Sequence, residues 1–259
     1  MEESNSYKLF LETNAPAIEE AIDRYKSQIS VNAKENLGAV IDEALASNKT
    51  RIRSILTLLG AKLVGGEVEE VLPSAVAVEF VHTGFKLFNA LSDNKDSEVN
   101  EIGLEEKFGK SLVLDAGIKL LNASYPLIFL NFEEKRELAV QAHTEIVECI
   151  DATGLDRGDK TDLLSDFDSP DNLSKTILTR LALRLGAILS GADYIELTNI
   201  SRFANLFENV YFLSEKGEAS PVTTEKIAND AKRVLVENFS SSEARTCLIQ
   251  LTDSLLKNN

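Results

Sequence analysis

The amino-acid sequence predicts an all-α fold, built as one helical-bundle domain over residues 1–259. The chain has few helix breakers, with five prolines and thirteen glycines and no tryptophan, and it is rich in residues with high helix propensity. Apolar residues recur at intervals of three and four along most of the chain, which is the helical period. An alternating strand pattern and an internal repeat are both missing from the sequence.

The helices can be placed by their apolar stripes and end signals. Leu178, Leu181, Leu185 and Ile188 predict one buried helix face, and Ser169-Pro170 supplies an N-cap and a proline for its first turn. Ser240 and Glu243 form a capping-box pattern before the last helix. The polar connections at 93–104, 153–170 and 216–222 are neither long nor biased enough to separate domains. In chain order the expected helices cover residues 13–30, 33–46, 50–65, 71–92, 107–131, 133–152, 171–190, 193–215, 223–238 and 241–257.

Composition narrows the classes of function. The formal net charge is -15, which argues against binding nucleic acid or an anionic membrane by bulk electrostatics. We expect no membrane span, because the longest apolar stretches, such as 125–132, are short and the N-terminus lacks an apolar signal core. Cys149 and Cys247 are far apart and form no CxxC pair, so we expect buried thiols of a cytoplasmic protein and no zinc site.

Several short motifs follow one another along the chain in a defined order. No single motif is specific, but their order and spacing together resemble the trans-polyprenyl diphosphate synthase family from about residue 45 to 255. The segments that carry the resemblance are Arg51-Ile52-Arg53-Ser54, Leu63-Val64-Gly65-Gly66, residues 78–83, Phe108-Gly109 with Val113-Leu114, Lys175-Thr176, Gly186-Ala187, Phe203-Ala204 and residues 231–235.

The resemblance implies an isoprenoid-synthase-like helical bundle that is shortened relative to the family, since a Lys-bearing loop and further helices are missing after the second metal motif. Family members ionise an allylic diphosphate and couple the resulting cation to isopentenyl diphosphate. Two Asp-Asp-x-x-Asp motifs hold the magnesium ions that neutralise the departing diphosphate. Within each motif the first and last aspartates are four residues apart, so they share a helix face.

Both metal motifs are degenerate in this sequence. The first reads Asn89-Ala90-Leu91-Ser92-Asp93, and the arginine pair that follows in the family falls at Glu98 and Val99. The second falls at residues 215–219, where a lysine replaces one carboxylate. We therefore expect no metal site and no cofactor in this chain, and Mg²⁺ in a catalytic partner. The degenerate motif positions of interest are Asn89, Ala90, Asp93, Glu215, Lys216 and Glu218.

The substrate-binding positions of the family are better preserved. Arg53 and His82 match positions that contact isopentenyl diphosphate, and Lys49 lies beside Thr50, where the family has its lysine. Lys49 and Arg53 are four residues apart and are expected to share a helix face. On the allylic side only Lys175 matches, and Gly84 and Phe85 match positions that set chain length in the tunnel. The alternative is that these residues are surface charges and core packing without a ligand.

Three functions remain open. The first is a non-catalytic subunit that supports chain elongation and product length in a catalytic polyprenyl synthase homologue, as a heterodimer or heterotetramer. The second is a module that binds a prenyl diphosphate or a protein without catalysis. The third is an active prenyltransferase with unusual metal ligation by Asp93, Asp96, Glu215 and Glu218. For the first we expect an interface on helices 107–131 and 133–152, with an apolar run that exceeds one core stripe: Leu120, Leu121, Tyr125, Leu127, Ile128 and Leu130.

Overall fold

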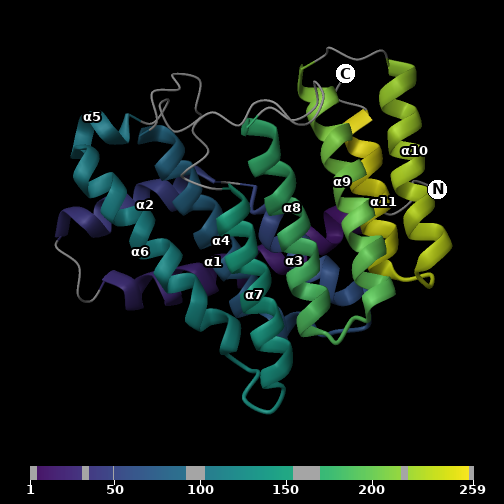
Figure 1. Ribbon diagram of the computed structural model, residues 1–259, viewed down its shortest axis with the longest axis horizontal. Helices are drawn as coiled ribbons and strands as arrows, with labels where there is room; N and C mark the ends of the chain where they lie inside the picture. Colours follow the sequence, from purple (N-terminus) through teal and green to yellow (C-terminus); the bar gives the residue numbers. More distant parts are fainter. Residues whose placement is uncertain are drawn as a thin grey trace.

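The computed structural model describes residues 5–30, 35–48, 50–91, 103–153, 170–216 and 221–256, and within these ranges it contains eleven α-helices and no strand. The predicted all-α fold class is therefore confirmed (Figure 1). The helices are α1 (Ser6–Ser30), α2 (Glu35–Ser47), α3 (Ile52–Leu63), α4 (Val68–Leu91), α5 (Leu104–Phe108), α6 (Lys110–Phe129), α7 (Arg136–Thr153), α8 (Pro170–Leu189), α9 (Tyr194–Lys216), α10 (Pro221–Asn238) and α11 (Glu243–Leu256).

The centre of the molecule is built around α4, which is buried over most of its 24 residues. A helix that is apolar on nearly all sides must be covered on all sides, and α4 packs against α3, α6 and α8 with further contacts to α1 and α2. Helices α9, α10 and α11 form a group at the opposite end of the molecule from α2, α5 and α6 (Figure 1). This arrangement leaves one side of α6 uncovered.

Two glycines allow α3 and α8 to approach each other closely. A Cβ atom at Gly60 would lie 2.2 Å from the Leu183 carbonyl oxygen, and one at Gly186 would lie 1.9 Å from the Thr57 carbonyl oxygen. These distances leave no room for a methyl group, because the obstructing atoms belong to the backbone. The Gly186-Ala187 motif in the sequence is thus explained by helix packing.

Several helix ends differ from the predictions, and three of the differences have a clear structural cause. The expected helix 107–131 is broken at Gly109, whose φ of 86° ends α5 and permits a new helix to begin at Lys110. Helix α1 begins at Ser6 rather than at residue 13 and contains Pro16 in its interior. The last helix is capped by Ser242, whose Oγ accepts from the Arg245 backbone N–H at 3.1 Å, and not by the predicted Ser240.

Two described helices, α4 and α6, are long and apolar enough to cross a membrane by length and composition, contrary to the expectation that every apolar stretch is too short. Buried core helices pass the same test, and 89% of the apolar window of α4 is buried inside the fold. Only 39% of the corresponding window of α6 is buried. The apolar character of α6 therefore exceeds what the described core uses.

Candidate functional site

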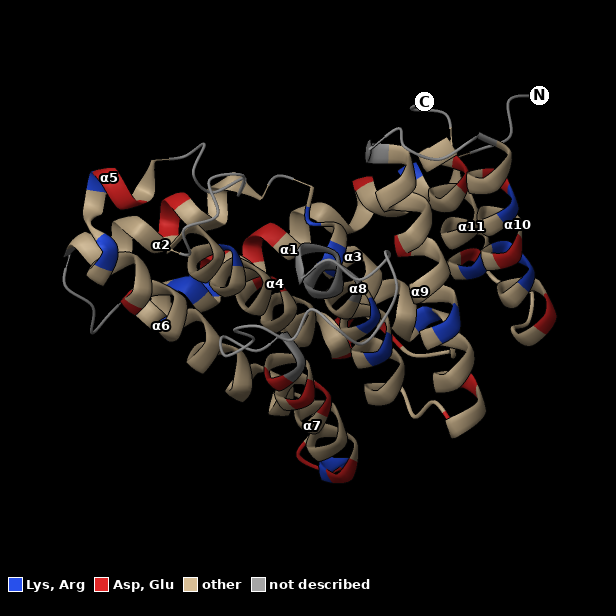
Figure 2. Cartoon of the chain, turned by 45° about the horizontal axis from the view of Figure 1, so that its top comes forward, with Lys and Arg blue, Asp and Glu red and all other residues tan. Residues whose placement is uncertain are grey.

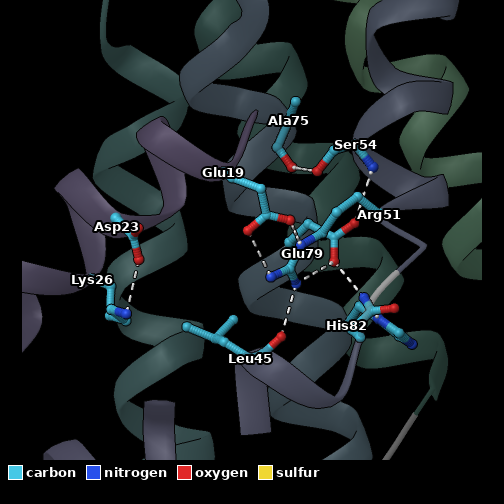
Figure 3. Close-up of polar contacts among 10 residues, drawn as sticks. Glu19, Asp23, Lys26, Leu45, Arg51, Ser54, Ala75, Glu79 and His82 are labelled. Carbon is cyan, nitrogen blue, oxygen red and sulfur yellow. Dashed lines mark hydrogen bonds and ion pairs between the residues drawn. The ribbon is translucent and has the colours of Figure 1, made fainter. Parts of the chain in front are cut away.

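A buried carboxylate organises the polar cluster between α1, α2, α3 and α4 (Figure 3). Glu79 of α4 is 0% exposed. Its Oε2 accepts a hydrogen bond from Asn48 Nδ2 at 2.5 Å, and its Oε1 accepts one from the Ser54 backbone N–H at 3.1 Å in the first turn of α3. The second bond satisfies an N–H group that the helix itself cannot pair.

Arg51 joins this carboxylate to the rest of the cluster (Figure 3). Its Nε and Nη2 donate to the two oxygens of Glu19 on α1 at 2.7 and 3.1 Å, and its Nη1 donates to the Leu45 carbonyl oxygen at 2.9 Å. The same Nη1 lies 4.0 Å from Glu79 Oε2. Arg51 holds a left-handed backbone conformation, with φ of 45°, directly before α3. A non-glycine residue in that region of backbone conformation is strained. The contacts of the Arg51 side chain with Glu19, the Leu45 carbonyl and Glu79 hold it there.

Opposing effects act on the pKa of the Glu79 carboxyl group in this cluster. Burial raises the pKa of the Glu79 carboxyl above its ordinary value, while the positive charges of Arg51 and Arg53 and the hydrogen bonds from Ser54 act in the opposite direction. Two guanidinium groups thus lie near one buried carboxylate. The cluster is therefore a candidate anion site as well as a structural junction.

The structure brings two of the predicted isopentenyl diphosphate residues to this cluster. His82 is buried and its Nδ1 lies 3.0 Å from Asn48 Nδ2. Arg53 is half-buried, and within the described part of the chain its buried Nε has no hydrogen-bond partner. Lys49 lies outside the described residues. The predicted shared helix face of Lys49 and Arg53 is wrong, because α3 begins only at Ile52.

The described part of the first metal motif does not fit a magnesium cluster. Asn89 is exposed and Ala90 is buried near the end of α4, and neither side chain offers a carboxylate. Asp93 and Glu218 lie outside the described residues, as do the side chains of Glu215 and Lys216 in α9 and of Lys175 in α8. Among the residues that the structure describes, no group of three His, Cys, Asp or Glu side chains is placed to hold a metal ion.

The predicted chain-length residues lie where α4 crosses α6. A Cβ atom at Gly84 would be 3.2 Å from the Gly117 carbonyl oxygen, and one at Gly117 would be 2.5 Å from the ring of Phe88. Phe85 is buried in the same core. Gly84 and Gly117 thus act as packing residues that let the two helices approach.

A second candidate site is the uncovered surface of α6 and α7, which we call the α6–α7 face. The exposed apolar side chains on it are Leu114, Ile118 and Phe129 of α6 and Val140 of α7. His143 of α7 packs against α6, with its ring centroid 5.2 Å from that of Tyr125 and 5.8 Å from that of Phe129. Four or more large apolar side chains on one surface indicate a contact site rather than scattered exposure.

The structure corrects which residues of this region face outward. Leu120, Leu127 and Ile128 belong to the core of the chain itself and are not available to a partner. Leu121 and Tyr125 are half-buried, and Leu130 is exposed. Helix α6 is as apolar as the sequence predicts, but its apolar residues lie on two opposite sides. One side faces α4 and the other faces outward.

Four residues of the polar cluster have no role that the sequence alone predicts. Glu79 had the clearest signal, since it is a lone carboxylate within an otherwise apolar stretch of α4. A charge at such a position must be paired or neutralised. The roles of Glu19, Asn48 and Arg51 depend on contacts between distant segments, and the motif that contains Arg51 does not predict its contacts.

Known proteins with similar sequences and structures were compared with this chain. No family model matches the chain. Geranylgeranyl pyrophosphate synthase 7 of Arabidopsis thaliana is 29% identical over 203 residues, covering 73% of this chain and 58% of that protein. The heterodimeric geranylgeranyl pyrophosphate synthase large subunit 2 of the same plant is 30% identical over 173 residues, covering 62% of this chain and 46% of that protein.

Solved structures share the whole fold at low sequence identity. The polyprenyl synthase of Caulobacter crescentus has a TM-score of 0.75 at 15% identity, over 99% of both chains. The geranyl diphosphate synthase small subunit of Antirrhinum majus has a TM-score of 0.73 at 19% identity, over 95% of this chain and 98% of that one. The fold is thus the all-α isoprenoid synthase fold.

The chain is thus similar in sequence to geranylgeranyl pyrophosphate synthases, and it shares its fold with solved structures of polyprenyl synthases. The chain spans 58% of the length of the curated relatives that it first matches.

Proposed function

We propose that this chain is a non-catalytic subunit of a heteromeric polyprenyl diphosphate synthase and that it pairs with a catalytic homologue through the α6–α7 face. The observation that carries the proposal is the uncovered apolar surface of that face. Ile118 is 45% exposed and Leu114 is 43% exposed in the middle of a helix whose other side is fully buried. Exposing a helix of this kind to water is unfavourable, and a partner of the same fold would cover it.

The degenerate first motif supports a role without independent catalysis. At Asn89 and Ala90 the chain offers an amide and a methyl group, and neither replaces the carboxylates that magnesium prefers. A catalytic partner would supply both metal motifs. This chain would then stabilise the partner and influence the length of its product.

The names of three similar proteins support heteromeric assembly. One curated relative is a large subunit of a heterodimeric synthase, and one structural neighbour is a small subunit of a geranyl diphosphate synthase. Another neighbour is a heterotetrameric geranyl pyrophosphate synthase from mint. Heteromeric assembly therefore occurs among proteins of this fold, which supports the proposal for this chain.

The test is co-expression with a homologue from the same organism that carries both Asp-Asp-x-x-Asp motifs. The wild-type chain is expected to co-purify with it and to change the length distribution of its prenyl products. Ile118→Asp should abolish co-purification, because it would bury an unpaired carboxylate in the contact. Ile195→Asp is the matched control, since Ile195 is an isoleucine that is 67% exposed on α9, outside the proposed contact.

The proposal fails if the Ile118 and Ile195 variants bind equally well, or if the chain alters neither the size nor the products of the homologue. Prenyl products formed by this chain alone with magnesium would instead support the active prenyltransferase.

A second candidate function, diphosphate binding, is favoured by the buried Nε of Arg53. Arg51 is already paired with Glu19, so the capacity for an anion rests on the Arg53 guanidinium near Glu79. Titration of the chain with isopentenyl diphosphate and with inorganic pyrophosphate tests this function. Arg53→Gln should weaken binding, whereas Arg202→Gln on the exposed side of α9 should not. Equal binding heats of the two variants in calorimetric titration would contradict diphosphate binding at Arg53.

A further inference from the structure

We infer that the α6–α7 face fits a different chain with a basic rim, and that its acidic rim discriminates against a second copy of this chain. The inference rests on the proposed function and adds the charge of the partner surface to it. It follows from how charged and apolar residues are distributed between the two helices.

The α6 half of the face is nearly uncharged. Its outward side chains recur at three and four residues, so they form one stripe along the helix. Asp115 is the single fully exposed charge beside that stripe within α6 after Lys110, and Lys119 is half-buried. The ribbon of α6 accordingly carries few charged positions (Figure 2). The outward stripe consists of Ser111, Leu114, Ile118, Asn122, Tyr125 and Phe129.

The α7 half of the face carries acidic side chains. Glu137, Glu148 and Asp151 are exposed on α7. Asp151 follows Val140 by eleven residues, which is about three helical turns, so both lie on the same side of α7. Arg136 is the exposed cation of the helix, and Figure 2 shows acidic positions toward both ends of α7. Glu145 adds no free charge, because it forms a bidentate ion pair with Arg184.

The acidic rim disfavours a symmetric homodimer relative to a complex with a different chain. In a two-fold homodimer each copy presents the same surface to the other, so an acidic rim meets an acidic rim. The formal net charge of -15 on each chain adds to the repulsion. Like charges at a rim select against a partner without reducing the apolar contact at the centre. A chain with the same apolar centre and lysines or arginines at its rim would satisfy both parts of the face.

The chain itself can be converted into a partner of that chemistry. The variant Glu137→Lys/Glu148→Lys keeps the apolar stripe and makes the α7 rim basic. Its control, Glu225→Lys/Glu237→Lys, makes the same change in net charge on exposed positions of α10, which lies away from α7 (Figure 1). Wild-type chain is mixed with each variant at equal concentration, and association is measured by sedimentation velocity at 20 mM and 500 mM salt. Circular dichroism first verifies that each variant is folded.

The mixture of wild type with the rim variant should associate about tenfold more tightly at low salt than wild type with itself, and the gain should shrink at high salt. The control variant should give a clearly smaller gain. Equal association of wild type with both variants, or a tight wild-type homodimer at low salt, would overturn the inference. Adding Ile118→Asn to the rim variant removes an apolar contact without adding charge. If the tighter association persists in this triple variant, α6 is not the contact surface. The proposed function would then be refuted, while the inference about the acidic rim would still be supported.

Discussion

Two residues on opposite sides of α6 provide a sharp test of the docking surface. Leu120 is 0% exposed and belongs to the core, whereas Ile118, two positions earlier, is 45% exposed. Leu120→Ala removes a fully buried side chain and is expected to cost about 2–5 kcal/mol of unfolding free energy, from lost burial and the cavity left behind. Ile118→Ala should change the stability of the isolated chain by less than about 1 kcal/mol.

The assay is thermal unfolding of both variants as isolated chains, followed by binding to the catalytic homologue. For a chain of this size the Leu120 variant should melt about 5–15 °C lower than wild type, and the Ile118 variant within about 3 °C of it. In the binding assay only the Ile118 variant reports on the contact without damaging the fold. If both variants lose stability equally, α6 is covered on both sides and the exposed-face argument is refuted.

Further predictions concern the core. Gly186→Ala should destabilise the chain by about 1–3 kcal/mol in urea unfolding, because the methyl group collides with the backbone of α3, whereas the same change in an open helix stabilises by about 1 kcal/mol. Burial raises the folded-state pKa of Glu79, so its contribution to stability is fully present below the unfolded pKa and is lost as pH rises through the folded value. The stability advantage of wild type over Glu79→Gln should therefore fall as pH rises above the ordinary carboxyl pKa of 4.5. A constant or rising advantage would show that Arg51 and Arg53 outweigh burial. Burial raises the pKa of Cys149 to about 12, so native protein at pH 8 should react with a thiol reagent no faster than it unfolds.

Most of the fold could be predicted from the sequence because amphipathic stripes are local features. The stripe from Leu178 to Ile188 and the proline at residue 170 place α8 correctly, and α8 does begin at Pro170. Errors occurred where the deciding interaction is distant. The start of α1 was missed because the Tyr7 backbone N–H donates to Gln250 on α11 at 2.9 Å, a contact that spans nearly the whole chain. Pro16 lies in the interior of this helix.

The candidate sites were less predictable because each depends on which way a side chain points. Leu120 and Ile118 are equally apolar in sequence, and only the packing of α4 on α6 decides which one faces outward. Likewise Arg53 was identified from a motif, but the conformation of Arg51 and the position of Glu79 decide what surrounds it. Motifs locate such a cluster, while tertiary contacts determine its chemistry.

The same contacts explain why the fold does not depend on the residues at two helix ends. Asn89 and Ala90 lie near the C-terminal end of α4, and Glu215 and Lys216 lie in the last turn of α9. The contacts that fix the core are elsewhere, in the close crossing of α3 and α8 and in the Arg51–Glu79 cluster near the start of α3. Residues at a helix end contribute little to those contacts, so substitutions there leave the bundle intact. An intact bundle with an uncovered apolar helix is then suited to act through a partner.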